Sequence, residues 1–351
     1  MGEFAEKANR AARALSATTT EYTNASLIYY QQGGMSDAEI AERTEVTIKM
    51  ANAAGQAAET VSDQLTAVWN NFYDGSKSLE YYADVLTALG AATASSTDEI
   101  VEGVQKFAAV ADTVGLSYEY AASALATVTA TTRESADIVG TAFKTLFARI
   151  QGLNLGETLD DGTTLNKYSQ ALESVGISIF EANGNMKTMD NILNELGDKW
   201  GTLSKNQQTA LAQTVAGVRQ YTQLVALMDN WDFFQKNLQT SYGAEGALNK
   251  QAEIYAESWE AARDRVTAAA EDIYASLLDD EFFIKILNGT EKVLEALGGF
   301  VDGMGGLEGV LSAAGGIFLN IYAKRMPETL NNLKQNLMVF TGLATKSMSD
   351  T

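Results

Sequence analysis

The sequence predicts an all-α protein made of helical hairpins, and three observations support this fold class. Apolar residues recur with helical spacing, capping-box patterns precede several of these runs, and Pro327 is the single proline among 351 residues. Proline removes an amide donor and clashes with the preceding helical turn, so its scarcity favours long helices. We expect the hairpins to stack into an elongated or multi-lobed array, with one small β-hairpin near residues 177–187.

Residues 1–92 and 93–155 are predicted to contain two copies of one helical hairpin. After a shift of 60 residues, polar, apolar and glycine positions align without gaps. The aligned positions include Ser36, Glu39 and Gly55 in the first copy and Ser96, Glu99 and Gly115 in the second. Glycine suits the left-handed position that ends a helix, so each copy reads as helix, glycine turn and second helix. The alternative is chance similarity between alanine-rich helices.

The second copy is followed by an apolar stripe. Phe143, Leu146 and Phe147 lie on one face of a helix together with Val139 and Ile150, because their spacing follows the helical period. We expect this stripe to be buried in the core.

Residues 156–200 depart from helical periodicity before a further helix. An acidic loop, residues 156–164, comes first. Ile177 and Ile179 then precede Asn183-Gly184, a dipeptide that favours a two-residue hairpin turn. We expect Gly184 at a tight turn between two short strands.

Residues 201–290 are predicted to be helical, and residues 291–351 to hold a glycine-rich apolar segment and a C-terminal helix. The apolar segment motivates an alternative function, a helical membrane-active or pore-forming protein acting through residues 298–323. Its most apolar run is Gly315, Gly316, Ile317, Phe318 and Leu319. Asp302 and Glu308 interrupt the segment and would be costly to bury in lipid. Liposome leakage that charges at Ile317 and Leu319 abolish would favour this alternative.

The composition excludes several classes of function. The chain has no histidine and no cysteine, which excludes histidine-dependent triads, thiolate nucleophiles, disulfides and histidine or cysteine metal sites. Its net charge of −20 disfavours nucleic-acid binding, since phosphate recognition needs clustered lysine and arginine. We therefore expect no cofactor, no metal and no direct contact with nucleic acid.

Paired carboxylates are the remaining catalytic option. Asp160-Asp161 and Asp279-Asp280-Glu281 are the obvious clusters. Glycoside hydrolysis needs two carboxyl groups about 5–9.5 Å apart across a cleft, and sequence neighbours provide no such cleft. We interpret these clusters as solvated loop charge and expect no catalytic residue. A muralytic enzyme is the third hypothesis, and a turbidity assay on cell walls tests it.

Several segments resemble, in order along the chain, the core of phage tail tape-measure proteins. These segments are residues 48–72, 104–133, 140–150, 176–200 and 216–230. The resemblance extends over about residues 10–290. It implies a structural virion protein and no enzyme, because the core of that family carries no catalytic residues. It also suggests that the chain is a folded portion of a longer protein.

The resemblance implies further expectations about place and partners. Such a protein is made in the bacterial cytoplasm, lies in the lumen of the virion tail, templates tail-tube assembly, sets tail length and is released at infection before the genome. The implied partners are the tail tube protein, tail assembly chaperones and tail-tip or baseplate proteins. Contact with the bacterial inner membrane at infection and a homotrimer in the tail are further implications.

Overall fold

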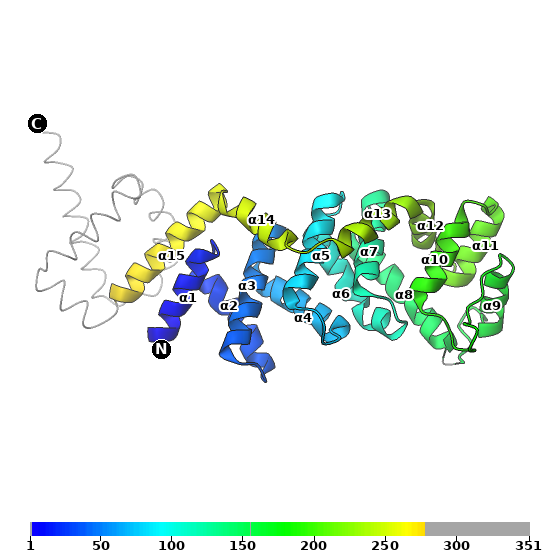
Figure 1. The fold of residues 1–351 in the computed structure, drawn as a ribbon, viewed down its shortest axis with the longest axis horizontal. Helices are drawn as coiled ribbons and strands as arrows, with labels where there is room; N and C mark the ends of the chain where they lie inside the picture. The colour runs from blue at the N-terminus through cyan, green and yellow to red at the C-terminus, as the bar shows by residue number, and fades with distance from the viewer. Residues whose placement is uncertain (1, 155, 278–351) are drawn as a thin grey trace, which may run out of the picture. The chain divides into compact units, whose positions relative to one another are not determined.

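The computed structural model describes residues 2–154 and 156–277, which form fifteen α-helices and no β-strand (Figure 1). The all-α prediction is therefore confirmed. The helices are α1 (Gly2–Ala14), α2 (Thr19–Gln32), α3 (Asp37–Ala54), α4 (Ala58–Phe72), α5 (Leu79–Ala92), α6 (Thr97–Thr113), α7 (Tyr118–Thr132), α8 (Ala136–Asn154), α9 (Leu165–Glu173), α10 (Met189–Trp200), α11 (Lys205–Ala216), α12 (Tyr221–Asp229), α13 (Trp231–Tyr242), α14 (Ala247–Ala256) and α15 (Trp259–Leu277).

Some predicted features lie outside the described residues. They include the cluster Asp279-Asp280-Glu281, the glycine-rich segment and its run Gly315, Gly316, Ile317, Phe318 and Leu319. The described helices fall almost wholly within one compact unit, Met1–Ile273.

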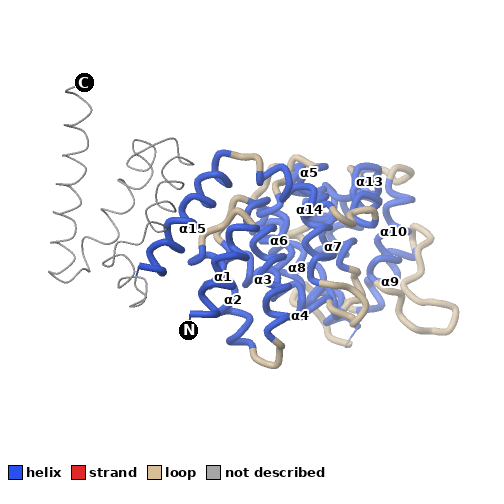
Figure 2. The backbone as a smooth tube through the Cα atoms, turned by 60° about the vertical axis from the view of Figure 1, so that its left-hand side comes forward, coloured by secondary structure: helices blue, strands red, loops and turns tan. Residues whose placement is uncertain are grey.

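Within this unit the chain runs out along a stack of helices and then returns over it. Helices α1 to α8 follow one another along the stack, and α9 to α11 lie at its far end (Figures 1 and 2). Helices α12 to α15 lead back, with α13 packed on α7 and α5 and α14 packed on α5 and α3. The return ends beside the first helix, where Asn9 Nδ2 donates to the carbonyl oxygen of Ala268 at 2.8 Å.

The two repeat copies end their first helices with the same glycine turn. Gly55 and Gly115 have φ of 66° and 67°, the left-handed region in which glycine carries no Cβ penalty. In both turns a backbone amide closes back on an alanine carbonyl. These bonds run from Gln56 N to Ala51 O at 3.1 Å and from Leu116 N to Ala111 O at 3.0 Å. Both copies also begin with a reciprocal capping box, from Ser36 to Glu39 and from Ser96 to Glu99.

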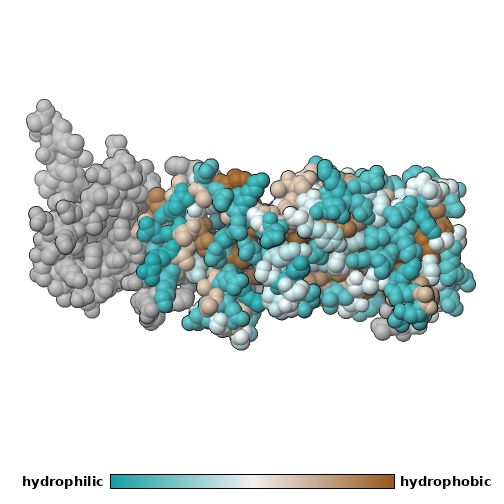
Figure 3. Space-filling model, viewed as in Figure 1, coloured by the Kyte–Doolittle hydropathy of each residue, from teal (hydrophilic) through white to brown (hydrophobic). Residues whose placement is uncertain are grey.

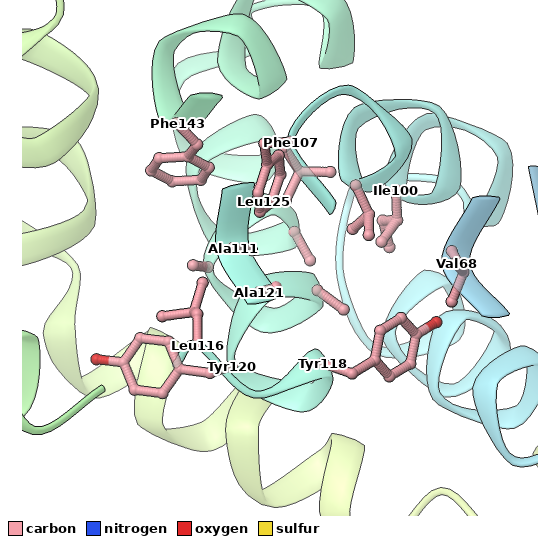
Figure 4. Packing of buried hydrophobic residues seen from close by; sticks show 14 of the residues in the cluster. Val68, Ile100, Phe107, Ala111, Leu116, Tyr118, Tyr120, Ala121, Leu125 and Phe143 are labelled. Carbon is pink, nitrogen blue, oxygen red and sulfur yellow. The ribbon is translucent and has the colours of Figure 1, made fainter. Parts of the chain in front are cut away.

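Helices α6 and α8 form the tightest part of the core. Phe143, Leu146 and Phe147 on α8 are each at most 2% exposed. Phe107 on α6 meets Phe143 edge to face at a ring-centroid distance of 5.5 Å, and Figure 4 shows the two rings side by side. The backbones approach closely at Gly140, where a Cβ atom would lie 2.6 Å from the carbonyl oxygen of Gly103.

The segment around Gly184 forms a turn with a single antiparallel bridge, between Phe180 and Met186, and not the two short strands that the sequence predicted. Gly184 itself has φ of 87°. Two backbone bonds flank this bridge, from Lys187 N to Ile179 O and from Glu181 N to Asn185 O, both at 2.8 Å. Pairing goes no further, because Ile177 N donates to Leu172 O and Met189 N donates to Val114 O instead of to each other's segments. The other side ends at Thr188, the N-cap of α10.

Candidate functional site

The candidate site residues that the sequence singled out serve turns and core packing. Gly55, Gly115 and Gly184 lie at three separate turns. Phe143, Leu146 and Phe147 lie together in the α6–α8 core. The structure therefore does not bring the two groups together, and their arrangement supports the fold instead of forming a reaction centre.

One carboxylate of the predicted acidic loop, Asp161, has a structural role. Asp161 Oδ2 pairs with Arg149 Nη2 on α8 at 2.9 Å, and Asp161 Oδ1 accepts from Thr163 N at 3.0 Å. Burial works to raise the pKa of Asp161, but the hydrogen bonds from Thr163 and Arg149 outweigh it and hold that pKa below its usual value. Asp161 therefore stays ionised and is a poor proton donor.

Arg149 connects three segments whose proximity was not predicted from the sequence. Besides its ion pair with Asp161, its Nη2 donates to the carbonyl oxygen of Thr214 on α11 at 3.4 Å. A Cβ atom at Gly217 would lie 3.1 Å from Arg149 Nη1, so the glycine leaves room for the guanidinium. Arginine suits this place because its planar donors reach several acceptors at once. Arg149 thus joins α8, the acidic loop and the end of α11.

A second structural carboxylate, Asp84 on α5, is buried and caps a helix of the returning segment. It is 4% exposed and accepts from Gly246 N, at the N-cap of α14, at 3.0 Å and from Leu248 N, in its first turn, at 2.8 Å. Burial raises the pKa of Asp84, although these two bonds act in the opposite direction. Asp84 therefore fixes where α14 begins relative to α5.

A third carboxylate, Asp190, joins the start of α10 to the start of α7. Both of its oxygens lie 3.4 Å from Ser117 N, and Met189 N donates to Val114 O at 3.1 Å beside it. Burial raises the pKa of Asp190 to about 6, against the opposing hydrogen bonds from Ser117, and the nearby Glu119 adds to the rise. Ionised Asp190 is therefore a destabilising group at neutral pH.

Replacing Asp190 by asparagine is expected to stabilise the protein at pH 7–8 by about 1–2 kcal/mol. The folded-state pKa lies above the unfolded value of about 3.9, so the contribution of Asp190 is fully present below pH 4 and is lost as pH rises through about 6. The gain is less than the full pKa difference implies, since asparagine gives up carboxylate bonds to Ser117. Urea unfolding of both proteins between pH 4 and pH 8 measures the effect. Parallel pH profiles would contradict this assignment.

The exposed aromatic residues near α4 largely cover one another. Tyr73 is 47% exposed and stacks on Trp69 at a centroid distance of 3.8 Å, while Arg43 Cζ lies 4.2 Å from the centre of the Trp69 ring. Both faces of the indole are thereby occupied, because a ring and a guanidinium at these distances cannot share one face. Trp69 therefore offers no free ring face for stacking.

The described surface is mostly hydrophilic, with separate apolar patches on the face in Figure 3. A shallow depression of about 540 Å³ lies where α5, α13 and α14 meet. Its two lysines, Lys236 and Lys250, are exposed and so give a ligand no buried charge. Between residues 2 and 277, the described carboxylates form no group of three able to hold a metal ion. None of the described helices is long and apolar enough to cross a bilayer.

Comparison with known proteins places the chain in a family of phage tail components. Residues 7–217 match the family described as phage-related minor tail protein, and the chain belongs to that family. It is 24% identical over 224 residues to the tape measure protein of Pneumococcus phage Dp-1. That alignment covers 62% of this chain and 18% of the phage Dp-1 protein, so the chain spans about a fifth of that relative. No solved structure matches. The resemblance to tail tape-measure proteins is thus confirmed.

Proposed function

We propose that the chain is a folded unit of a tail tape-measure protein that lies in the lumen of the tail tube, templates polymerisation of the tube protein and sets tail length. The family match over residues 7–217, which extends from α1 through α11, carries this proposal. The similarity to the tape measure protein of phage Dp-1 supports the same reading. In this proposal the role is structural, with no enzymatic step.

The partners in this proposal are other tail proteins. They are the tail tube protein, the tail assembly chaperones that act in the bacterial cytoplasm, and the tail-tip or baseplate proteins. Three copies share the tail lumen, and the protein leaves it at infection, ahead of the genome, towards the bacterial inner membrane. The net charge of −20 supports this proposal, because an acidic protein that shares the tail tube with DNA is repelled by the phosphates and does not bind them.

The described unit has the character of a folded segment and not of an extended ruler. A single helix of 351 residues would reach about 530 Å at 1.5 Å per residue. The described helices have between 9 and 19 residues and pack on one another through a continuous core. We infer that this unit contributes a compact body to the tape measure.

Disruption of the gene in its phage or prophage tests the proposal. Electron microscopy of the resulting lysates is expected to show heads without normal tails, or tube polymers of uncontrolled length. Tails of normal length and normal number would contradict the proposed function.

A further inference from the structure

The last described helices form a strap over the stack, which we define as α14 and the adjoining part of α15, residues 247–269. The strap follows a short loop, Gly243–Gly246, with a glycine at each end and φ of 80° at Gly246. It then runs beside α5 and α3 and ends beside α1 (Figure 1). The family match stops at residue 217, so the strap lies beyond the matched part of the chain.

Among the described side chains of the strap, one large apolar side chain is buried against the stack. Leu248 is the only buried residue of α14, at 0% exposure. On the described part of α15 the buried apolar side chains are Ala261 and Ala268. The free energy gained by burial scales with the apolar area removed from water. Two alanines and one leucine therefore contribute far less stabilising free energy than the aromatic cluster of α6 and α8.

The strap also makes polar contacts with the stack, and two of them are buried: Leu248 N donates to Asp84, and Asn9 donates to the carbonyl oxygen of Ala268. Asp84 thereby caps the start of α14, and Asn249 bridges Lys49 on α3 and Glu80 on α5 in an exposed position. Near α1, Arg265 Nη1 donates to Ser16 Oγ at 2.8 Å. The exposed bonds of Asn249 exchange readily for water, whereas the buried bonds of Asp84 and Asn9 fix the docked position and are replaced by water only when the strap opens.

The strap also has internal contacts that do not depend on the stack. Tyr255 Oη donates to Asp264 Oδ2 at 3.2 Å, which joins α14 to α15, and Arg263 pairs with Asp264 at 3.0 Å. These bonds are retained if the two helices leave the stack together.

We propose that the strap is a detachable element, which undocks from α3, α5 and α1 at its glycine loop while helices α1 to α13 remain folded. Helix α13 stays because Phe234, at 0% exposure, packs on Tyr120 of α7 at a centroid distance of 4.7 Å. Undocking exposes the α5 face around Asp84. It also gives the chain that follows a tether of up to about 35 Å, since the 23 residues of the strap stay helical at 1.5 Å per residue.

Hydrogen exchange followed by mass spectrometry on the full 351-residue chain tests this proposal. Amides of residues 247–269 are expected to exchange at least about 10-fold faster than those of α6 to α8, through an opening that leaves α13 protected. A single common rate for the strap and for α6 to α8 would overturn the proposal, because it would mean that both open only by global unfolding.

A matched pair of variants on α14 strengthens the test. Leu248→Ala is expected to accelerate exchange of the strap about 30-fold or more without changing α6 to α8, because it removes the one large apolar side chain that α14 buries in the stack. Ile254→Ala, on the same helix but at a side chain 57% exposed, is the control and is expected to leave exchange unchanged. Equal acceleration of the strap and of α6 to α8 by Leu248→Ala would contradict independent opening.

Discussion

Replacing Phe147 by alanine is expected to lower the free energy of unfolding by about 3–5 kcal/mol. Phe147 is 2% exposed, and its ring lies 5.7 Å from that of Phe107 and 5.8 Å from that of Phe143. The substitution removes the aromatic contacts and leaves a cavity between two helices whose backbones already touch at Gly140. Those helices cannot move together to fill it, so little of the cost is recovered by relaxation.

Ile138→Ala is the matched control for this prediction, because Ile138 lies on the same helix and is 51% exposed. It is expected to change stability by no more than about 0.5 kcal/mol. Thermal and urea unfolding of both variants measure the difference. Equal stability of the Phe147 variant and the wild type would place that side chain at the surface.

Replacing Gly140 by alanine is expected to destabilise the protein by about 3 kcal/mol, although alanine is the better helix former by about 1 kcal/mol. The added Cβ would meet the Gly103 carbonyl oxygen at 2.6 Å and the Gly103 Cα at 3.1 Å. Both atoms belong to the backbone of α6, so no side chain can turn aside, and the two helices must separate.

Gly201→Ala separates this steric effect from helix propensity. Gly201 follows α10 with φ of −65°, and nothing lies within 4 Å of the Cβ it would gain. This variant is expected to be neutral or slightly stabilising in the same unfolding experiments. Equal stability of Gly140→Ala and Gly201→Ala would contradict the close approach of the α6 and α8 backbones at Gly140.

The helices could be predicted from the sequence because their signals are local. The capping boxes at Ser36, Ser96 and Ser204 and the glycine turns at Gly55 and Gly115 depend on residues a few positions apart. The burial of Phe143, Leu146 and Phe147 likewise follows from helical spacing. These features identify the helices and their inward faces, but not which helix faces which.

The polar contacts between distant segments could not be predicted in this way. Asp84 caps a helix about 160 residues later in the chain, and Arg149 reaches Thr214 across 65 residues. Each is a single charged residue in an ordinary helical run, and its partner is defined only by packing. Gly140 carried a weak signal, since glycine within a helical apolar stripe often marks a close approach of two helices.

The reduced hairpin at Gly184 shows a limit of local signals even over short distances. Asn183-Gly184 correctly places the turn, but Ile177 N is taken by Leu172 O and Met189 N by Val114 O, and the N-cap at Thr188 begins a helix before a second strand can form. These backbone groups are therefore satisfied without a longer ladder.

The distribution of tail lengths in complemented phage tests whether this chain sets tail length. A phage with the gene disrupted would be supplied with the wild-type gene, with Gly140→Ala or with Gly201→Ala, and tails would be measured by electron microscopy. We expect uniform tails of normal length from the wild-type gene and from Gly201→Ala, and few or irregular tails from Gly140→Ala. Normal tails of uniform length in the disrupted phage without any complementing gene would contradict the account.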